Sequence, residues 1–122
     1  MTPFGQKLRD MRESRGITQR DLAAELHVSP AYLSALEHGR RTRPTFQFVQ
    51  RVIGYFNIIW DEAEELQRLA SVSKPRVVVD TSGLDPAATE LANLLARTIA
   101  DLDRETLKKM TALIIERVKT TT

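Results

Sequence analysis

The sequence predicts an all-α protein, and three features predict it. Serine, threonine or aspartate stands at the start of most expected helices, and proline follows directly in Thr2-Pro3, Ser29-Pro30 and Asp85-Pro86. Such residues cap the free N–H groups of a first helical turn, where proline is also tolerated. Apolar residues then recur every three or four positions, the period of a helix with one buried face. One short run, residues 76–80 (RVVVD), has the composition of a strand instead.

Five helices are expected within residues 1–72. The first four start after a capping residue, at Thr2, Thr18, Ser29 and Thr45, and the fifth runs from about Trp60 to Ala70. Gly16 and Gly39 end the first and third, because glycine readily adopts the left-handed conformation that terminates many helices. The apolar residues of these helices are Leu8, Met11, Leu22, Ala23, Leu26, Leu33, Leu36, Phe46, Phe48, Val49, Val52, Ile53, Phe56, Ala63, Leu66 and Leu69.

Composition changes after residue 72. Residues 73–84 contain Pro75, the run 76–80 and a Thr-Ser-Gly turn, and we expect an extended connector there that can form a single strand. Two further helices are expected in residues 85–120, starting at Asp85-Pro86 and at Asp103. Their apolar residues are Leu91, Leu94, Leu95, Ile99, Leu102, Leu107, Met110, Leu113, Ile114 and Val118. Because two such helices cannot bury their apolar faces alone, we expect a C-terminal helical hairpin used for dimerisation.

Charge is distributed unevenly along the chain. Residues 1–60 hold nine lysines and arginines against five acidic residues, whereas residues 61–122 hold nine against eleven. The net charge is therefore +4 in the first half and −2 in the second, and +2 in total. A basic first half suits a domain that binds a polyanion, with a second half that has another role.

Several classes of function find no support in the residues. The chain has no cysteine and two histidines, so it offers no thiol nucleophile, no cysteine-based zinc site and no evident nucleophile–base pair. No glycine-rich phosphate loop is present, and no apolar run reaches the ~20 residues that span a bilayer. We therefore expect neither an enzyme nor a membrane protein, with no metal and no cofactor. A cytoplasmic, nucleoid-associated location is expected.

Two short helices separated by a tight turn stand out, at residues 18–26 and 29–37. Only His27 and Val28 separate them, as in helix-turn-helix units. Ala23 has the small size that a close helix crossing needs. The second helix keeps an outer face of polar and small residues, which suits insertion into the major groove of DNA. That face consists of Ser29, Ala31, Tyr32, Ser34, Ala35 and His38.

These segments resemble a known family. QKLRDMR (6–12), GITQRDLA (16–23), VSPAYLSALEHG (28–39) and Arg43-Pro44 are similar to the XRE / Cro–C1-type, or lambda-repressor-like, transcriptional regulators, over about residues 4–70. The resemblance implies a five-helix DNA-binding domain that binds double-stranded DNA as a homodimer. It also implies a transcriptional repressor on a palindromic operator, with helix 29–37 in the major groove.

The resemblance assigns roles to individual residues. Gln19, at the start of the first motif helix, is expected to hold a phosphate, and Arg12 with Glu37 matches a salt bridge that locks the first helix to the recognition helix. Ser29, Ala31, Tyr32 and Ala35 match positions that point at base edges. From its place on the same face, Ser34 is also expected to take part in direct readout, and His38 either donates to a phosphate or simply ends the helix. Arg40, Arg41 and Arg43 follow the recognition helix, where the family's basic loop contacts the DNA backbone.

The motif departs from many relatives in ways that affect how DNA is read. Pro30, Ala31 and Ala35 stand where relatives often carry long polar side chains. Among base groups, alanine can contact only the methyl group of thymine. We therefore expect recognition of DNA shape through arginines to contribute more to the specificity. Tyr32 is open to two interpretations at this stage, as a DNA contact or as a half-buried packing residue.

The tail leaves alternatives open. A second hypothesis is an antitoxin that binds its own promoter and masks a toxin, its protein partner, through residues 85–120. A third is an interaction module that uses the fold without DNA, which Arg40, Arg41 and Arg43 argue against.

Overall fold

The computed structural model describes residues 1–40 and 43–121, and these residues form helices joined by turns and loops. They form two compact units, Met1–Val77 and Val78–Thr122. No strand occurs in the described part of the chain, so the single strand considered for residues 76–80 is not formed. The all-α prediction is confirmed.

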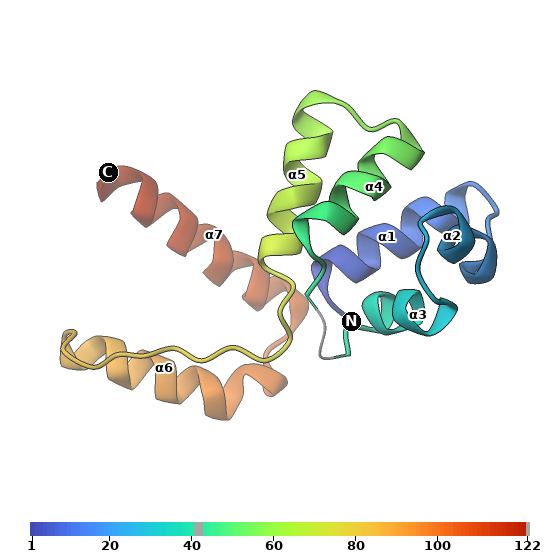
Figure 1. Cartoon of the computed structure of the whole chain (residues 1–122). Helices are drawn as coiled ribbons and strands as arrows, with labels where there is room; N and C mark the ends of the chain where they lie inside the picture. Colours follow the sequence, from blue (N-terminus) through green and yellow to red (C-terminus); the bar gives the residue numbers. More distant parts are fainter. Residues whose placement is uncertain (41–42, 122) are drawn as a thin grey trace. The chain divides into compact units, whose positions relative to one another are not determined.

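The first unit holds five α-helices, and the second holds two with a short 3-10 turn between them (Figure 1). They are α1 (Pro3–Ser14), α2 (Gln19–Glu25), α3 (Pro30–His38), α4 (Phe46–Phe56), α5 (Trp60–Ser71), α6 (Pro86–Thr98), η1 (Ile99–Asp101) and α7 (Arg104–Thr121).

The predicted capping residues start the helices. The Thr2, Thr18, Ser29 and Thr45 hydroxyls each accept a hydrogen bond from the N–H three residues on, and the Asp85 carboxylate accepts one from Ala87. Gly39 ends α3 with φ 69°, the left-handed conformation predicted for it. The starts of these helices and the end of α3 are therefore predictable from their capping residues.

The first unit has one apolar core, made by all five helices. Its fully or nearly fully buried residues are Phe4, Leu8, Leu22, Ala23, Leu26, Leu33, Leu36, Phe48, Val49, Val52, Phe56, Leu66 and Ala70. Phe46, by contrast, is 63% exposed, because it lies in the first turn of α4 on the side away from this core.

Close packing of α1 against α3 positions the motif. A Cβ atom on Gly5 would lie 2.3 Å from the Leu36 carbonyl oxygen, so only glycine permits this approach. The end of α5 is tied to the start of α1 by buried Ser73, whose Oγ accepts from the Phe4 N–H at 2.8 Å and donates to the Leu69 carbonyl. Helix α3 therefore packs closely on α1, whose start is held in turn by Ser73 after the end of α5.

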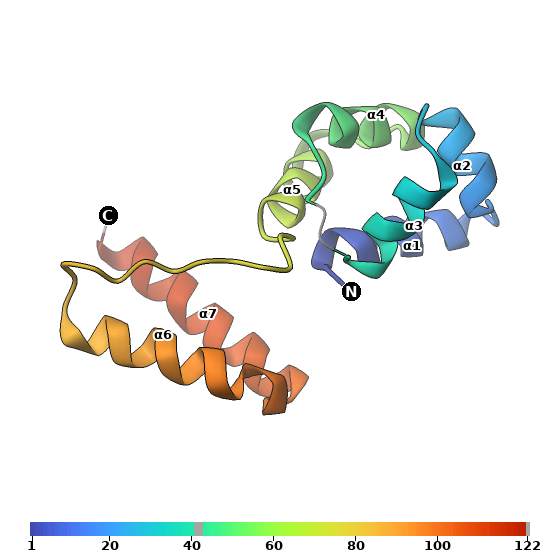
Figure 2. The same ribbon diagram turned by 60° about the horizontal axis from the view of Figure 1, so that its bottom comes forward.

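Among the described residues of the second unit, no apolar side chain is fully buried. Its two long helices, α6 and α7, meet at η1 and diverge from it (Figures 1 and 2). Large apolar side chains on both helices and in η1 stay about half exposed: Leu91, Leu94, Ile99, Leu113, Ile114 and Ile115. None of the described helices is both long enough and apolar enough to cross a membrane.

Candidate nucleic-acid interface

The helix-turn-helix unit is formed by α2 and α3. The two helices pack against each other through buried apolar side chains. These are Leu22 and Ala23 of α2 and Leu33 of α3, all fully buried. Ala23 has the small size expected at the crossing. In the turn, the Val28 N–H donates to the Ala23 carbonyl at 3.0 Å, and His27 adopts φ 59°. The short turn predicted from the sequence is therefore closed by a backbone hydrogen bond.

A buried carboxylate connects three helices of the unit. Arg12 on α1 donates from Nε to Glu37 Oε2 at 2.8 Å and from Nη2 to Oε1 at 3.1 Å. Glu37 lies on α3 and is 1% exposed. Its neighbour Arg12 also donates from Nη1 to the Ile17 carbonyl at 2.8 Å. The predicted lock between α1 and α3 is confirmed, and the carboxylate raises the pKa of Arg12 above its ordinary value through a side-chain hydrogen bond.

Gln19 joins the same carboxylate. Its amide nitrogen Nε2 donates to Glu37 Oε1 at 2.9 Å, a contact between the first residue of α2 and α3. Sequence reasoning missed this partner, because the two residues are 18 positions apart. An amide carries two N–H groups, so one remains for a phosphate. The phosphate contact expected of Gln19 stays a prediction.

The outer face of α3 carries small side chains. Ala31 and His38 are exposed, while Ser34 and Ala35 are half-buried. Exposed Ser29 caps the helix by accepting from the Tyr32 N–H at 3.0 Å, which leaves its own O–H free to donate. His38 Nδ1 lies 2.8 Å from the Ser34 carbonyl and 3.3 Å from its hydroxyl.

Tyr32 packs as well as facing outward. Its ring makes an edge-to-face contact with Phe48, with centroids 5.5 Å apart, and the residue is half-buried. Burial raises the pKa of the Tyr32 hydroxyl, and the positive charge of Arg51 opposes that effect. The phenol is therefore neutral at ordinary pH and can donate a hydrogen bond.

Arginines stand beyond the C-terminal end of α3 and on α4. Arg40 and Arg43 are exposed, and Arg41 lies outside the described residues. The Arg40 N–H donates to the Ala35 carbonyl at 3.0 Å, which fixes the backbone as it leaves the helix. Sequence reasoning missed Arg51, an exposed residue of α4 whose Nη1 donates to the Leu26 carbonyl at 2.8 Å. Its only signal in the sequence was that it is the one charged residue of α4.

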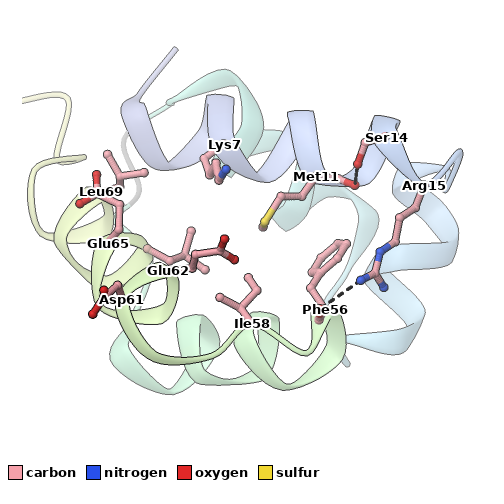
Figure 3. A pocket seen from close by; sticks show the side chains of 11 residues that line it. Lys7, Met11, Ser14, Arg15, Phe56, Ile58, Asp61, Glu62, Glu65 and Leu69 are labelled. Carbon is pink, nitrogen blue, oxygen red and sulfur yellow. Dashed lines mark hydrogen bonds between the residues drawn. The ribbon is translucent and has the colours of Figure 1, made fainter.

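A cavity of about 420 Å³ lies elsewhere in the first unit (Figure 3). Its walls come from α1, α5 and the end of α4, and neither α2 nor α3 contributes to it. Arg15 closes one end by donating to the Phe56 carbonyl at 3.0 Å, with its guanidinium 4.7 Å from the centre of the Phe56 ring. Among the described residues, no group of three or more histidine and carboxylate side chains could hold a metal ion.

The comparison with known families decides the assignment. A family model described as a helix-turn-helix domain matches residues 3–66, which is just over half of the chain. The chain belongs to this helix-turn-helix family. The resemblance to XRE-like regulators noted in the sequence is thereby confirmed at the level of the family.

Relatives within the helix-turn-helix family are named as transcriptional regulators. The HTH-type transcriptional regulator RghRB of Bacillus subtilis is 31% identical over 61 residues, which are 50% of this chain and 44% of that protein. SinR of Bacillus subtilis is 28% identical over 68 residues (52% and 61%), and DdrOP3 of Deinococcus deserti is 36% identical over 53 residues (43% and 40%). The chain thus spans about half the length of the curated relatives it matches.

A solved structure is also similar to this helix-turn-helix protein along its length. The complex of the SinR protein with the SinI protein has a chain that is 20% identical, with a TM-score of 0.45. The match covers 98% of this chain and 99% of that one.

Proposed function

We propose that this chain is a sequence-specific DNA-binding transcriptional regulator, acting as a repressor, that inserts α3 into the major groove of double-stranded DNA. The observation that carries the proposal is the combination of a locked helix and a free outer face. Glu37 holds α3 from within the unit, while Ala31 and His38 on the same helix stay exposed. A groove ~12 Å wide admits one such helix.

The residues around α3 supply the complementary chemistry. Exposed Arg40 and Arg43 are proposed to hold backbone phosphates, together with Arg51 and the free amide N–H of Gln19. Arg41 follows Arg40 in sequence and has the same proposed role. Side chains proposed to face base edges are Ser29, Tyr32, Ser34 and His38 as hydrogen-bonding groups and Ala31 and Ala35 as apolar contacts to thymine methyl groups.

Few of these groups can distinguish bases directly. The face holds two alanines and no long polar side chain that forms paired hydrogen bonds to one base. We therefore propose that part of the specificity comes from the shape and deformability of the DNA, sensed through arginine contacts to the backbone.

We also propose a homodimer held by α6 and α7. Their exposed side chains include Leu94 (53%) and Leu113 (54%), and an apolar surface of this kind is stabilised by a partner. A second copy is the partner that DNA recognition itself requires, because one recognition helix covers only a short half-site. Two copies related by a twofold axis place two recognition helices on a palindromic operator.

Mapping the chain's binding sites on the genome tests the regulator proposal. The expected result is an inverted repeat whose half-site centres lie about 10–10.5 base pairs apart or at a multiple of that spacing. Enriched sites without any shared sequence, or single unpaired motifs, would argue against a symmetric repressor.

Analytical ultracentrifugation of the full chain tests the dimer. Leu94→Lys places a charge on the exposed apolar face of α6 and should shift the protein to a monomer. Ala96→Lys is a matched control, because Ala96 is exposed on the other side of the same helix. A monomeric wild-type chain at every concentration would rule the homodimer out.

A further inference from the structure

The connector between the two units exposes three consecutive valines. Val77, Val78 and Val79 are 65%, 91% and 67% exposed, and the backbone through them runs as an open trace without helical coiling (Figures 1 and 2). Valine is enriched in strands, where its branched side chain packs on a pleated surface. The described structure provides no neighbouring strand for this segment, so its backbone N–H and C=O groups have no ladder partner there.

The residues on either side of the valines carry opposite charges. Arg76 precedes them and Asp80 follows them, and both are exposed. Within the described part of the chain, neither takes part in a salt bridge. The Asp80 carboxylate accepts from the Ser82 N–H at 2.9 Å, and hydrogen bonding from Ser82 lowers the pKa of Asp80. A carboxylate has about four acceptor sites, so it can also accept from an arginine.

This order of residues is self-complementary in one arrangement. If two copies of the segment pair antiparallel about Val78, residue 76 of one copy faces residue 80 of the other, and residue 77 faces residue 79. The ribbon then contains two ion pairs, each between Arg76 of one copy and Asp80 of the other. Each valine lies opposite a valine of the other copy. A parallel pairing in register would instead place arginine opposite arginine and aspartate opposite aspartate, which is unfavourable.

We propose that residues 76–80 of two copies of this chain form a two-stranded antiparallel ribbon centred on Val78. The pairing gives ladder partners to the backbone groups on one edge of each segment, brings the exposed valines into cross-strand contact and forms two cross-strand ion pairs. Because identical strands paired antiparallel are related by a twofold axis, the ribbon has the symmetry of a palindromic operator. It would hold the two chains together at a fixed point in the connector of each chain.

The ribbon rests on the proposed homodimer. An isolated two-stranded ribbon of five residues is marginal in water, so it forms only between chains that α6 and α7 already hold together. The ribbon and the homodimer can nevertheless be refuted separately. The position of a cross-link tests the ribbon, whereas the mass of the protein in solution tests the homodimer.

A disulfide cross-link in the full chain tests the pairing. The chain has no cysteine, so Val78→Cys introduces a single thiol. Opposed Cα atoms in an antiparallel pair lie about 4.5–5.5 Å apart, within the range that a disulfide spans. Arg76→Cys is the control, because the two residues 76 lie about 14 Å apart along an antiparallel ribbon. We expect mild oxidation to cross-link the Val78→Cys chain into a dimer and to leave the Arg76→Cys chain unlinked.

Two further experiments complete the test. One mixes two cysteine variants, and the other exchanges the charges at residues 76 and 80. Arg76→Cys and Asp80→Cys chains should cross-link to each other only when mixed. In the Val78→Cys background, Arg76→Asp should slow the cross-link about tenfold, and adding Asp80→Arg should restore it.

Each outcome decides one question. A dimer by ultracentrifugation that does not cross-link at residue 78 overturns the ribbon and leaves the proposed homodimer standing. Equal cross-linking at residues 76 and 78 also overturns it, because that result indicates parallel or random encounters. A chain that stays monomeric overturns both, while its DNA binding is measured independently.

Discussion

Arg12 Nε on α1 lies 2.8 Å from Glu37 Oε2 on α3, and the Glu37 side chain is 2% exposed. The pair joins residues 25 positions apart in the sequence and ties α1 to α3. Removing one partner of a buried pair leaves an unpaired charge and costs about 3 kcal/mol. Glu37→Gln should therefore lower the free energy of unfolding by about that amount, measured by urea denaturation of the full chain.

The exposed pair between Arg9 and Glu13 is the matched control. Its side chains are 44% and 54% exposed, so Glu13→Gln should leave the unfolding curve unchanged. Equal effects of Glu37→Gln and Glu13→Gln would show that burial of Glu37 contributes nothing to the lock.

Gly5 sets how closely α1 approaches α3. A Cβ atom at this position would lie 2.3 Å from the Leu36 carbonyl oxygen and 3.0 Å from that of Glu37. Gly5→Ala should separate the two helices and lower the unfolding midpoint in a thermal melt. Gly54→Ala is the contrasting change, because a Cβ there meets nothing within 4 Å and alanine favours a helix by about 0.5–1 kcal/mol. A stabilising Gly5→Ala would contradict the packing described for α1 and α3.

Helix α7 should lose its first turn in acid. The Asp103 carboxylate accepts from the Thr106 N–H at 2.8 Å, and this hydrogen bonding lowers the pKa of Asp103. A depressed folded pKa gives stabilisation that is present above the ordinary aspartate pKa, near 4, and lost as the pH falls through the folded value. Amide chemical shifts of residues 104–107 should therefore move toward coil values below pH ~4. In Asp103→Asn, whose amide oxygen also caps but does not titrate, this pH dependence should be absent.

Tyr32 combines packing with an outward hydroxyl, and two substitutions separate these roles. Tyr32→Phe keeps the ring against Phe48 and should leave the unfolding curve unchanged while altering sequence preference at one position of each half-site. Tyr32→Ala should lower stability as well, because the edge-to-face contact is lost. Unaltered sequence preference in Tyr32→Phe, assayed by selection from a random duplex pool, would assign the residue to packing alone.

Sequence reasoning found the parts of the fold that local chemistry specifies. Capping residues such as Thr18 and Ser29 mark helix starts because their hydroxyls bond N–H groups three residues away, and Ala23 marks the crossing because of its size. The lock between Arg12 and Glu37 was predicted only through the family resemblance, since its residues lie far apart in the chain.

Other features depend on tertiary contacts that one sequence does not specify. The Gln19 bond to Glu37 and the Arg51 bond to the Leu26 carbonyl both link separate helices. Trp60 starts α5 at φ 54°, a conformation that bulky residues avoid, so local preference gave no sign of it. The divergence of α6 and α7 was likewise not indicated by their apolar periodicity, which only identifies faces.

The salt dependence of DNA affinity tests the central claim most directly, measured for the wild-type chain, Arg43→Ala and a control, Arg68→Ala on α5. Arg68 is an exposed arginine already paired with Glu65, outside the α2–α3 unit. The wild-type affinity should fall linearly with salt on logarithmic axes, and Arg43→Ala should weaken binding to all sequences and reduce the slope by about one, whereas Arg68→Ala should change neither. An affinity insensitive to salt, or a slope that Arg43→Ala leaves unchanged, would contradict a DNA interface built on α3 and its arginines.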